Sequence, residues 1–172
     1  MHHPFFLKNL PRREILEKVR ALYPAMDIDA FECYMALLEV AGELLSVNEA
    51  QLSRHGTSQG RVRVMIHLHR TPGKCLSPCE LAQRMAVSPA TITGLLDGLE
   101  RGRMVRRERS SKDRRSVRVR LTAQGIRSLD RLMPERFRLV SRLMTPLSVS
   151  ERATLVRLLN SISAKLKEIA PS

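Results

Sequence analysis

The chain has 172 residues, a formal net charge of +13 and a sequence pI near 10.9. This charge predicts a polyanionic partner, either nucleic acid or an acidic membrane surface, and the 3% aromatic content disfavours a binder that stacks single-stranded bases. No apolar run approaches the roughly 18 to 20 residues of a membrane span. The three cysteines lack the repeating spacing of a disulfide framework. We therefore expect a cytoplasmic protein.

The first part of the chain predicts three helices. Apolar residues from Ile15 to Leu22 indicate a short helix before Pro24, and those from Phe31 to Leu52 recur at the spacing of one long amphipathic helix. Gly56 is expected to end this helix, because glycine enters the left-handed conformation without strain. Ser58 is then expected to cap a further helix that continues to about His69.

Two short helices with clear start signals follow the Pro72-Gly73 turn. The run Ser77-Pro78-Cys79-Glu80 supplies an N-cap hydroxyl, a proline at the first helical position and a glutamate that caps in return. Ser88-Pro89 repeats the cap and proline ahead of a helix that continues to Arg101. Each segment has a small apolar face, so the pattern predicts a helix-turn-helix.

The stretch Arg101 to Arg120 combines dense positive charge with the pattern of a β-hairpin. It holds nine arginines and one lysine against two acidic residues. At its end, valines and a leucine alternate with arginines, as in a strand with one buried face. The polar run Ser110 to Asp113 is interpreted as the hairpin tip. Because so much of the net charge lies on one element, we interpret the stretch as a binding site.

Two long helices are predicted after the hairpin. Thr122 caps a segment with a regular apolar stripe from Ile126 to Leu147, and a capping box at Ser148 to Glu151 opens the last helix. The apolar faces at both ends of the chain exceed what one small domain can bury. We therefore expect them to pair with a second copy of the chain.

Three segments resemble the MarR family of transcriptional regulators: LSRHGTSQGR (52–61), SPCELAQRMAVSPATITGLLDGLERGRMVRR (77–107) and DRRSVRVRLTAQG (113–125). The resemblance extends over nearly the whole chain. It implies a mainly α fold with a small β-wing, a winged helix-turn-helix inside a helical, triangular homodimer. It also implies three regions: N-terminal dimerisation helices (1–56), the winged DNA-binding region (57–124) and C-terminal dimerisation helices (125–172).

The resemblance implies sequence-specific binding to double-stranded DNA. The N-terminal part of the second short helix would enter the major groove through Ser88, Pro89, Ala90, Thr91 and Thr93. The wing would contact phosphates and the minor groove through Arg109, Lys112, Arg114 and Arg115. By the family pattern, Asp113 would orient an arginine and Arg115 would enter the groove. The helix-turn-helix elements of the two protomers would lie about 34 to 36 Å apart, which is one turn of DNA. The resemblance therefore predicts a palindromic operator.

The expected function is a repressor of its own or neighbouring genes that responds to a small anionic or aromatic effector. The length and the extra N-terminal helix resemble the urate-responsive branch of the family. Urate is not implied, since Trp is absent, Arg63 stands where that branch has an acid, and Leu95 stands where it has an arginine. The candidate ligand-binding residues are Tyr34, Arg61, Arg63 and His67. Ordinary surface ion pairs are the alternative for Arg61 and Arg63.

Several alternatives remain at this point. Cys33 lies close to the reactive thiol of peroxide-sensing relatives, although a buried, inert thiol is the simpler expectation. A metal-responsive regulator would use His67, His69, Cys75 and Cys79, but their spacing matches no standard zinc site, and we expect no metal or cofactor. A low-specificity architectural DNA binder would share the basic wing. No nucleophile and base pair, phosphate-binding glycine loop or carboxylate pair stands out, so we do not expect an enzyme.

Overall fold

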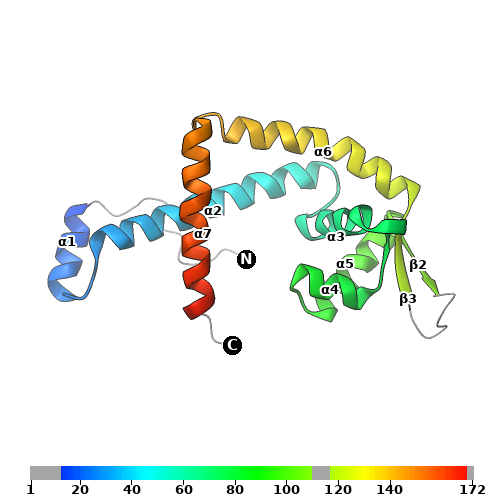
Figure 1. Cartoon of the computed structure of the whole chain (residues 1–172), viewed down its shortest axis with the longest axis horizontal. Helices are drawn as coiled ribbons and strands as arrows, with labels where there is room; N and C mark the ends of the chain where they lie inside the picture. Colours follow the sequence, from blue (N-terminus) through cyan, green and yellow to red (C-terminus); the bar gives the residue numbers. More distant parts are fainter. Residues whose placement is uncertain (1–12, 110–116, 170–172) are drawn as a thin grey trace. The chain divides into compact units, whose positions relative to one another are not determined.

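The computed structural model describes residues 13–109 and 117–169, and within these ranges the fold is mainly α-helical with one small antiparallel sheet (Figure 1). The expected mainly α fold with a small β-wing is therefore confirmed. The chain divides into two compact units, Met1–Arg63 and Val64–Ser172. Across the two described ranges, no helix is both long and apolar enough to cross a membrane.

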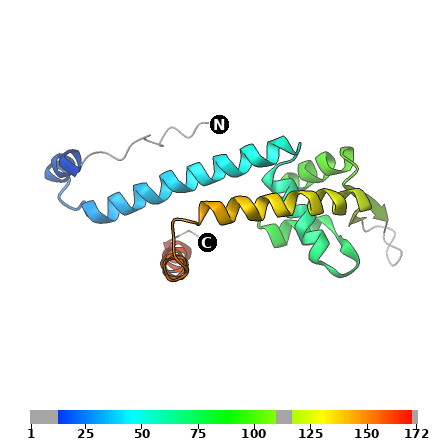
Figure 2. The same ribbon diagram turned by 90° about the horizontal axis from the view of Figure 1, so that it is seen from above.

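The first unit contains α1 (Arg13–Leu22) and α2 (Ile28–Arg54), and Figure 2 shows α2 as one unbroken helix. The guanidinium of Arg13 donates to Asp29 Oδ1 at 2.9 Å and to Glu32 Oε2 at 3.2 Å, which ties the start of α1 to the first turns of α2. Both helices were predicted, and α2 extends beyond its predicted range at each end.

Short local signals end α2 and begin α3 (Gln59–Arg70). Gly56 has a φ of 64°, the left-handed conformation expected of a glycine at this point. The amide of Arg61 donates to Ser58 Oγ at 3.5 Å, so the predicted cap forms.

The second unit is built around α4 (Pro78–Met85) and α5 (Pro89–Arg101). The capping box before α4 is reciprocal: the amide of Glu80 donates to Ser77 Oγ at 3.1 Å, and the amide of Ser77 donates to Glu80 Oε2 at 2.6 Å. The apolar faces of the two helices meet, as predicted. Their buried residues are Leu81, Ala82 and Met85 on α4 and Ile92, Leu96 and Leu99 on α5.

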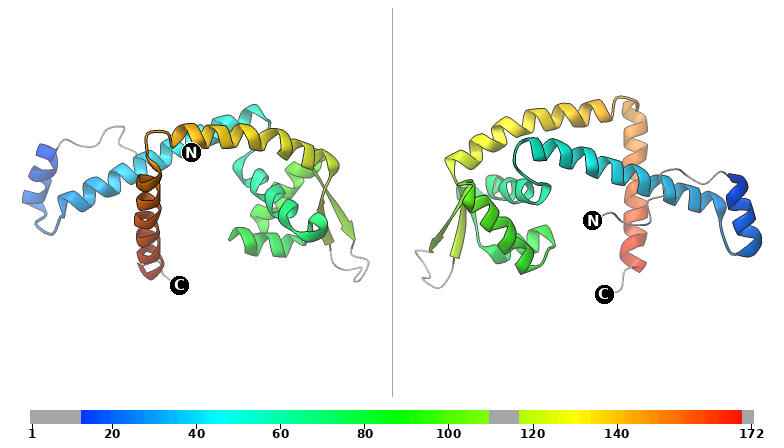
Figure 3. Two further views of the ribbon diagram at one scale, coloured as in Figure 1. Left: turned by 45° about the horizontal axis from the view of Figure 1, so that its top comes forward. Right: turned by 180° about the vertical axis from the view of Figure 1, so that it is seen from behind.

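The unit also contains a three-stranded sheet in the order β1-β3-β2. Figure 3 shows its two long strands, β2 and β3, as neighbouring arrows. Strands β2 (Val105–Arg109) and β3 (Val117–Leu121) form the predicted antiparallel pair. Val119 and Leu121 are buried, whereas Val117, at the outer end, is 40% exposed. The third strand, β1 (Cys75–Leu76), pairs with β3 and was not predicted, because two residues are too short for an alternating pattern.

The chain continues into α6 (Ala123–Leu143) and α7 (Val149–Ile169). The start of α6 lies very close to the turn between α5 and β2. Thr122 Oγ1 donates toward the Met104 carbonyl at 3.0 Å, and a Cβ added at Gly125 would overlap that same carbonyl oxygen. Only glycine therefore fits at position 125, and α6 begins at a fixed point beside the helix-turn-helix.

Candidate nucleic-acid interface

The N-terminal half of α5 presents short, uncharged side chains to solvent. Ser88, Pro89, Ala90, Thr91 and Thr93 are all exposed, and the first ionisable residue of the helix is Asp97. These five predicted contact residues therefore share one accessible region of the helix.

Their hydroxyl groups are largely engaged within the helix itself. Ser88 Oγ accepts from the amide of Thr91 at 3.2 Å and forms a second hydrogen bond with Thr91 Oγ1 at 2.9 Å. Thr93 Oγ1 donates to the carbonyl of Pro89 at 3.0 Å. The hydroxyl donors that the sequence suggested for base reading are thus partly committed, which leaves methyl groups and surface shape for contact with a partner.

A second feature fixes α5 to the sheet. Arg107 on β2 reaches α5, where its guanidinium donates to Asp97 Oδ1 at 2.6 Å and to Glu100 Oε2 at 2.7 Å. Its backbone amide also donates to Glu100 Oε1 at 3.1 Å. The hydrogen bond with Asp97 is the main cause that raises the pKa of Arg107 above its ordinary value. We call this three-residue cluster the Arg107 clamp.

Sequence analysis did not identify the Arg107 clamp. The sequence signal for it is two acids at the i and i+3 positions near the end of a helix, followed by an arginine at the third position of a strand. Without the fold, this arginine cannot be told apart from its neighbours in the basic stretch.

Other arginines of the sheet also bind acids of the chain. Arg118 on β3 contacts Glu80 at the start of α4, with 3.3 Å between Nη1 and Oε2. The pKa of Glu80 is lowered, first by the hydrogen bonds from Ser77 and then by the charge of Arg118. The capping glutamate of α4 is thus also an anchor for the sheet.

The remaining sheet contacts surround Glu108 on β2. Its carboxylate binds Arg106 at 2.6 Å and Arg120 at 3.0 Å, and the hydrogen bond from Arg120 is the main cause that lowers its pKa. Arg120 also donates to the Gly73 carbonyl at 2.6 Å. Much of the positive charge of the strands is therefore balanced by acids of the same unit. Among the described residues of the basic stretch, Arg101 and Arg103 are exposed and have no ion pair with another described residue.

The tip of the wing lies outside the described residues, and with it the predicted contacts Lys112, Asp113, Arg114 and Arg115. Arg109 is the last residue of β2, where its backbone is paired with Val117.

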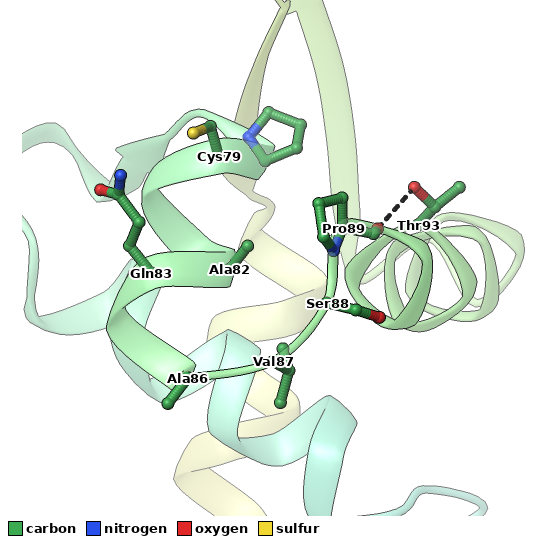
Figure 4. Close-up of a pocket in the computed structure, with 9 residues that line it drawn as sticks. Cys79, Ala82, Gln83, Ala86, Val87, Ser88, Pro89 and Thr93 are labelled. Atoms are coloured by element: carbon green, nitrogen blue, oxygen red, sulfur yellow. Dashed lines mark hydrogen bonds between the residues drawn. The ribbon is translucent and has the colours of Figure 1, made fainter. Parts of the chain in front are cut away.

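A mainly apolar recess of about 540 Å³ lies between α4 and α5 (Figure 4). Its lining combines residues of α4 and of the turn with residues predicted to contact DNA. These are Pro78, Cys79, Ala82, Gln83, Ala86, Val87, Ser88, Pro89 and Thr93. No lysine or arginine lines it.

The candidate effector residues do not line this recess. Tyr34 lies on α2 and is 56% exposed, whereas Arg61, Arg63 and His67 lie on α3. Cys33 on α2 is exposed, so the expectation of a buried thiol is wrong for the single chain. The reason is that its side of α2 is not covered by another element of its unit.

The two histidines and two cysteines considered for a metal are not gathered into a site. His67 and His69 lie on α3, Cys75 on β1 and Cys79 on α4. Within the described part of the chain, no three His, Cys, Asp or Glu side chains are placed to hold a metal ion.

A capped helix-turn-helix followed by an antiparallel hairpin defines a winged helix-turn-helix DNA-binding protein. The model of the MarR family matches residues 55–116. The HTH-type transcriptional repressor YetL of Bacillus subtilis is 31% identical over 93% of this chain and 96% of its own. The regulator PecS of Dickeya dadantii is 24% identical over 89% of this chain and 93% of its own. The chain belongs to the MarR family of DNA-binding transcription regulators.

Solved structures share this fold. Sco3205, a MarR family regulator from Streptomyces coelicolor solved in complex with DNA, superposes with a TM-score of 0.74 at 22% identity, over 86% of this chain and 91% of its own. A mutant MarR from E. coli complexed with operator DNA gives a TM-score of 0.65 at 25% identity, over 74% of this chain and 90% of its own.

Proposed function

We propose that the protein is a homodimeric repressor that binds a palindromic operator, with α5 in the major groove and the wing in the adjoining minor groove. The observation that carries this proposal is the exposed, neutral N-terminal half of α5, on a helix whose C-terminal half the Arg107 clamp fixes to β2. A helix held in this way presents its first turns to base edges while the hairpin follows the backbone.

The two parts of this surface have different tasks. Arg109, Lys112, Arg114 and Arg115 supply affinity through phosphates and the minor groove, and Asp113 orients an arginine. The neutral residues of α5 supply sequence preference through methyl contacts and fit. Because strong hydrogen-bond donors are few on this helix, DNA shape contributes a large share of the specificity.

The dimer is formed by the helices at both ends of the chain, residues 1–56 and 125–172. The supporting observation is the number of large apolar side chains that the single chain leaves exposed on them. They include Ile15 and Leu22 on α1, Tyr34 and Leu45 on α2, Phe137 on α6, and Leu158 and Leu166 on α7. A second copy is the partner that covers such faces in a protein of this class.

The reading role of α5 is tested by Thr91→Ala. Duplexes selected by the wild-type protein from a random-sequence library are compared with unselected duplexes in mobility-shift titrations at one salt concentration. We expect the ratio of the two affinities to fall about tenfold, because a contact to a base edge is lost while phosphate contacts remain. Thr145→Ala makes the same chemical change at an exposed position after α6 and should leave the ratio unchanged. Equal losses on both kinds of DNA would show that Thr91 only positions the helix.

Effector control is supported by the recess between α4 and α5. Its occupant would compete with DNA for Ser88, Pro89 and Thr93, which belong to both surfaces. Since the lining carries no cation, it favours a neutral aromatic molecule over an anion. Indole should therefore release the selected duplex at concentrations where benzoate does not, as measured by fluorescence anisotropy. Release by benzoate alone would place the effector site elsewhere.

A further inference from the structure

Gly94 lies in the middle of α5, the sixth of its thirteen residues. It is exposed, and a Cβ added to it would meet no atom within 4 Å. The contrast with Gly125 is clear, since a Cβ there would overlap the Met104 carbonyl. Nothing in the described chain occupies the space that a side chain at position 94 would fill.

Nothing in the fold of the DNA-free protein requires a glycine at position 94. Gly94 belongs to the regular part of the helix, far from either cap, and its φ is not positive. A glycine in a helix interior lowers the folding equilibrium constant about fivefold relative to alanine. The fold alone would therefore favour alanine.

The side of α5 on which Gly94 lies gives it a different role. Ile92 and Leu96 are buried and define the inner face of the helix. Gly94 follows Ala90 by four residues and Thr91 by three, so the three residues share the outer face. This is the face that carries the contacts proposed for base reading.

We propose that Gly94 is a specificity-determining residue of the recognition helix, the point at which its backbone approaches the floor of the DNA groove most closely. The inference rests on the proposed function of α5. The major groove is about 12 Å wide and 8.5 Å deep, and a helix with its side chains is about 10 to 12 Å across. A helix that lacks one central side chain sits deeper in such a groove, so that Thr91 and Ala90 reach base edges despite their short side chains.

The test is Gly94→Ala, with Gly94→Leu as a larger probe, in the full chain. Gly94→Ala should raise the melting temperature by about 3 °C, because helix propensity improves and no packing is disturbed. Its affinity for the selected duplex should fall about tenfold, and that of Gly94→Leu about a hundredfold, whereas affinity for unselected DNA changes less than about twofold. Ser141→Ala, at an exposed position of α6, controls for the effect of added helix stability and should leave DNA binding unchanged.

The outcomes separate this inference from the proposed function. Unchanged binding of the selected duplex by Gly94→Ala and Gly94→Leu, together with a loss for Thr91→Ala, overturns the role of Gly94 alone. If Thr91→Ala and Gly94→Leu both keep the sequence preference of the wild type, α5 does not read DNA and the proposed function fails as well. A lower melting temperature for Gly94→Ala would show that the fold requires this glycine, which also overturns the inference.

Discussion

The winged helix-turn-helix and the last helix of the chain differ in the burial of their apolar residues. Between α4 and β3, most of the large apolar residues of the helix-turn-helix and sheet are buried, with Leu81 and Val119 at 0% exposure, and Val117 at the outer end of β3 is an exception. Along α7 no residue is buried, and Leu166 and Ile169 are 60% and 67% exposed. The difference indicates that the DNA-binding part has a complete core within one chain, whereas the apolar face of α7 is left uncovered in the single chain, as expected if α7 takes part in the proposed dimer.

The largest effect expected from this comparison is on assembly. Leu158→Glu combined with Ile162→Glu places charges on the apolar face of α7, where both side chains are exposed in the single chain. Burying a leucine or isoleucine stabilises by about 1.5 to 3 kcal/mol, so the dimer should dissociate at least about a thousandfold more readily. Analytical ultracentrifugation measures this change.

Lys165→Glu is the matched control, because it makes the same total change of charge on α7 at a side chain that is 68% exposed. It should leave the dimer intact. In the double variant the circular dichroism of the remaining helices should be retained. Loss of all helical signal would contradict the view that the winged part has a complete core of its own.

The next effect concerns the winged part alone. Arg107→Ala removes the contacts with Asp97 and Glu100 that fix α5 to β2. Because these side chains are partly exposed, the two ion pairs contribute little to stability, and the free energy of unfolding should fall by less than about 1 kcal/mol. Affinity for the selected duplex should fall about tenfold through misorientation of α5, with the dimer unchanged.

Two further variants sharpen this prediction. Arg107→Lys should restore only part of the affinity, because an ammonium cannot hold two carboxylates in the planar geometry of a guanidinium. Arg106→Ala removes the same charge from β2, but its partner is Glu108 on the same strand, so it should have a smaller effect. Equal losses for Arg106→Ala and Arg107→Ala would show that only the charge matters.

The elements with strong local signals were predictable from the sequence. Ser77 with Glu80, Ser88 with Pro89, and Thr122 each mark a helix start that the structure confirms, since these caps depend on a few neighbouring residues. The hairpin followed from the alternation around Val119, which one buried face imposes.

Contacts between distant residues were not predictable in the same way. The pairing of Arg118 with Glu80 spans 38 positions, and the position of β1 depends on β3, not on its own two residues. The sequence therefore indicated a basic stretch but not which arginines are committed to acids of the fold. The absence of a buried residue on α7 shows a related limit: its apolar stripe predicts a helix with a covered face but does not say which molecule covers it.

The smallest effect expected is on the turn between α4 and α5. Ala86, the C-cap of α4, has a φ of 52°, a left-handed conformation that costs a residue with a Cβ roughly 1 to 2 kcal/mol. Ala86→Gly relieves this strain but adds about 0.5 to 1 kcal/mol of unfolded-state entropy, so the free energy of unfolding should rise by about 0.5 to 1 kcal/mol. Urea denaturation at fixed protein concentration measures the change. Ala90→Gly makes the same substitution in the helical conformation of α5 and should destabilise. Equal losses of stability for Ala86→Gly and Ala90→Gly would show that the turn is not strained. The stability of the winged part would then depend mainly on its buried core.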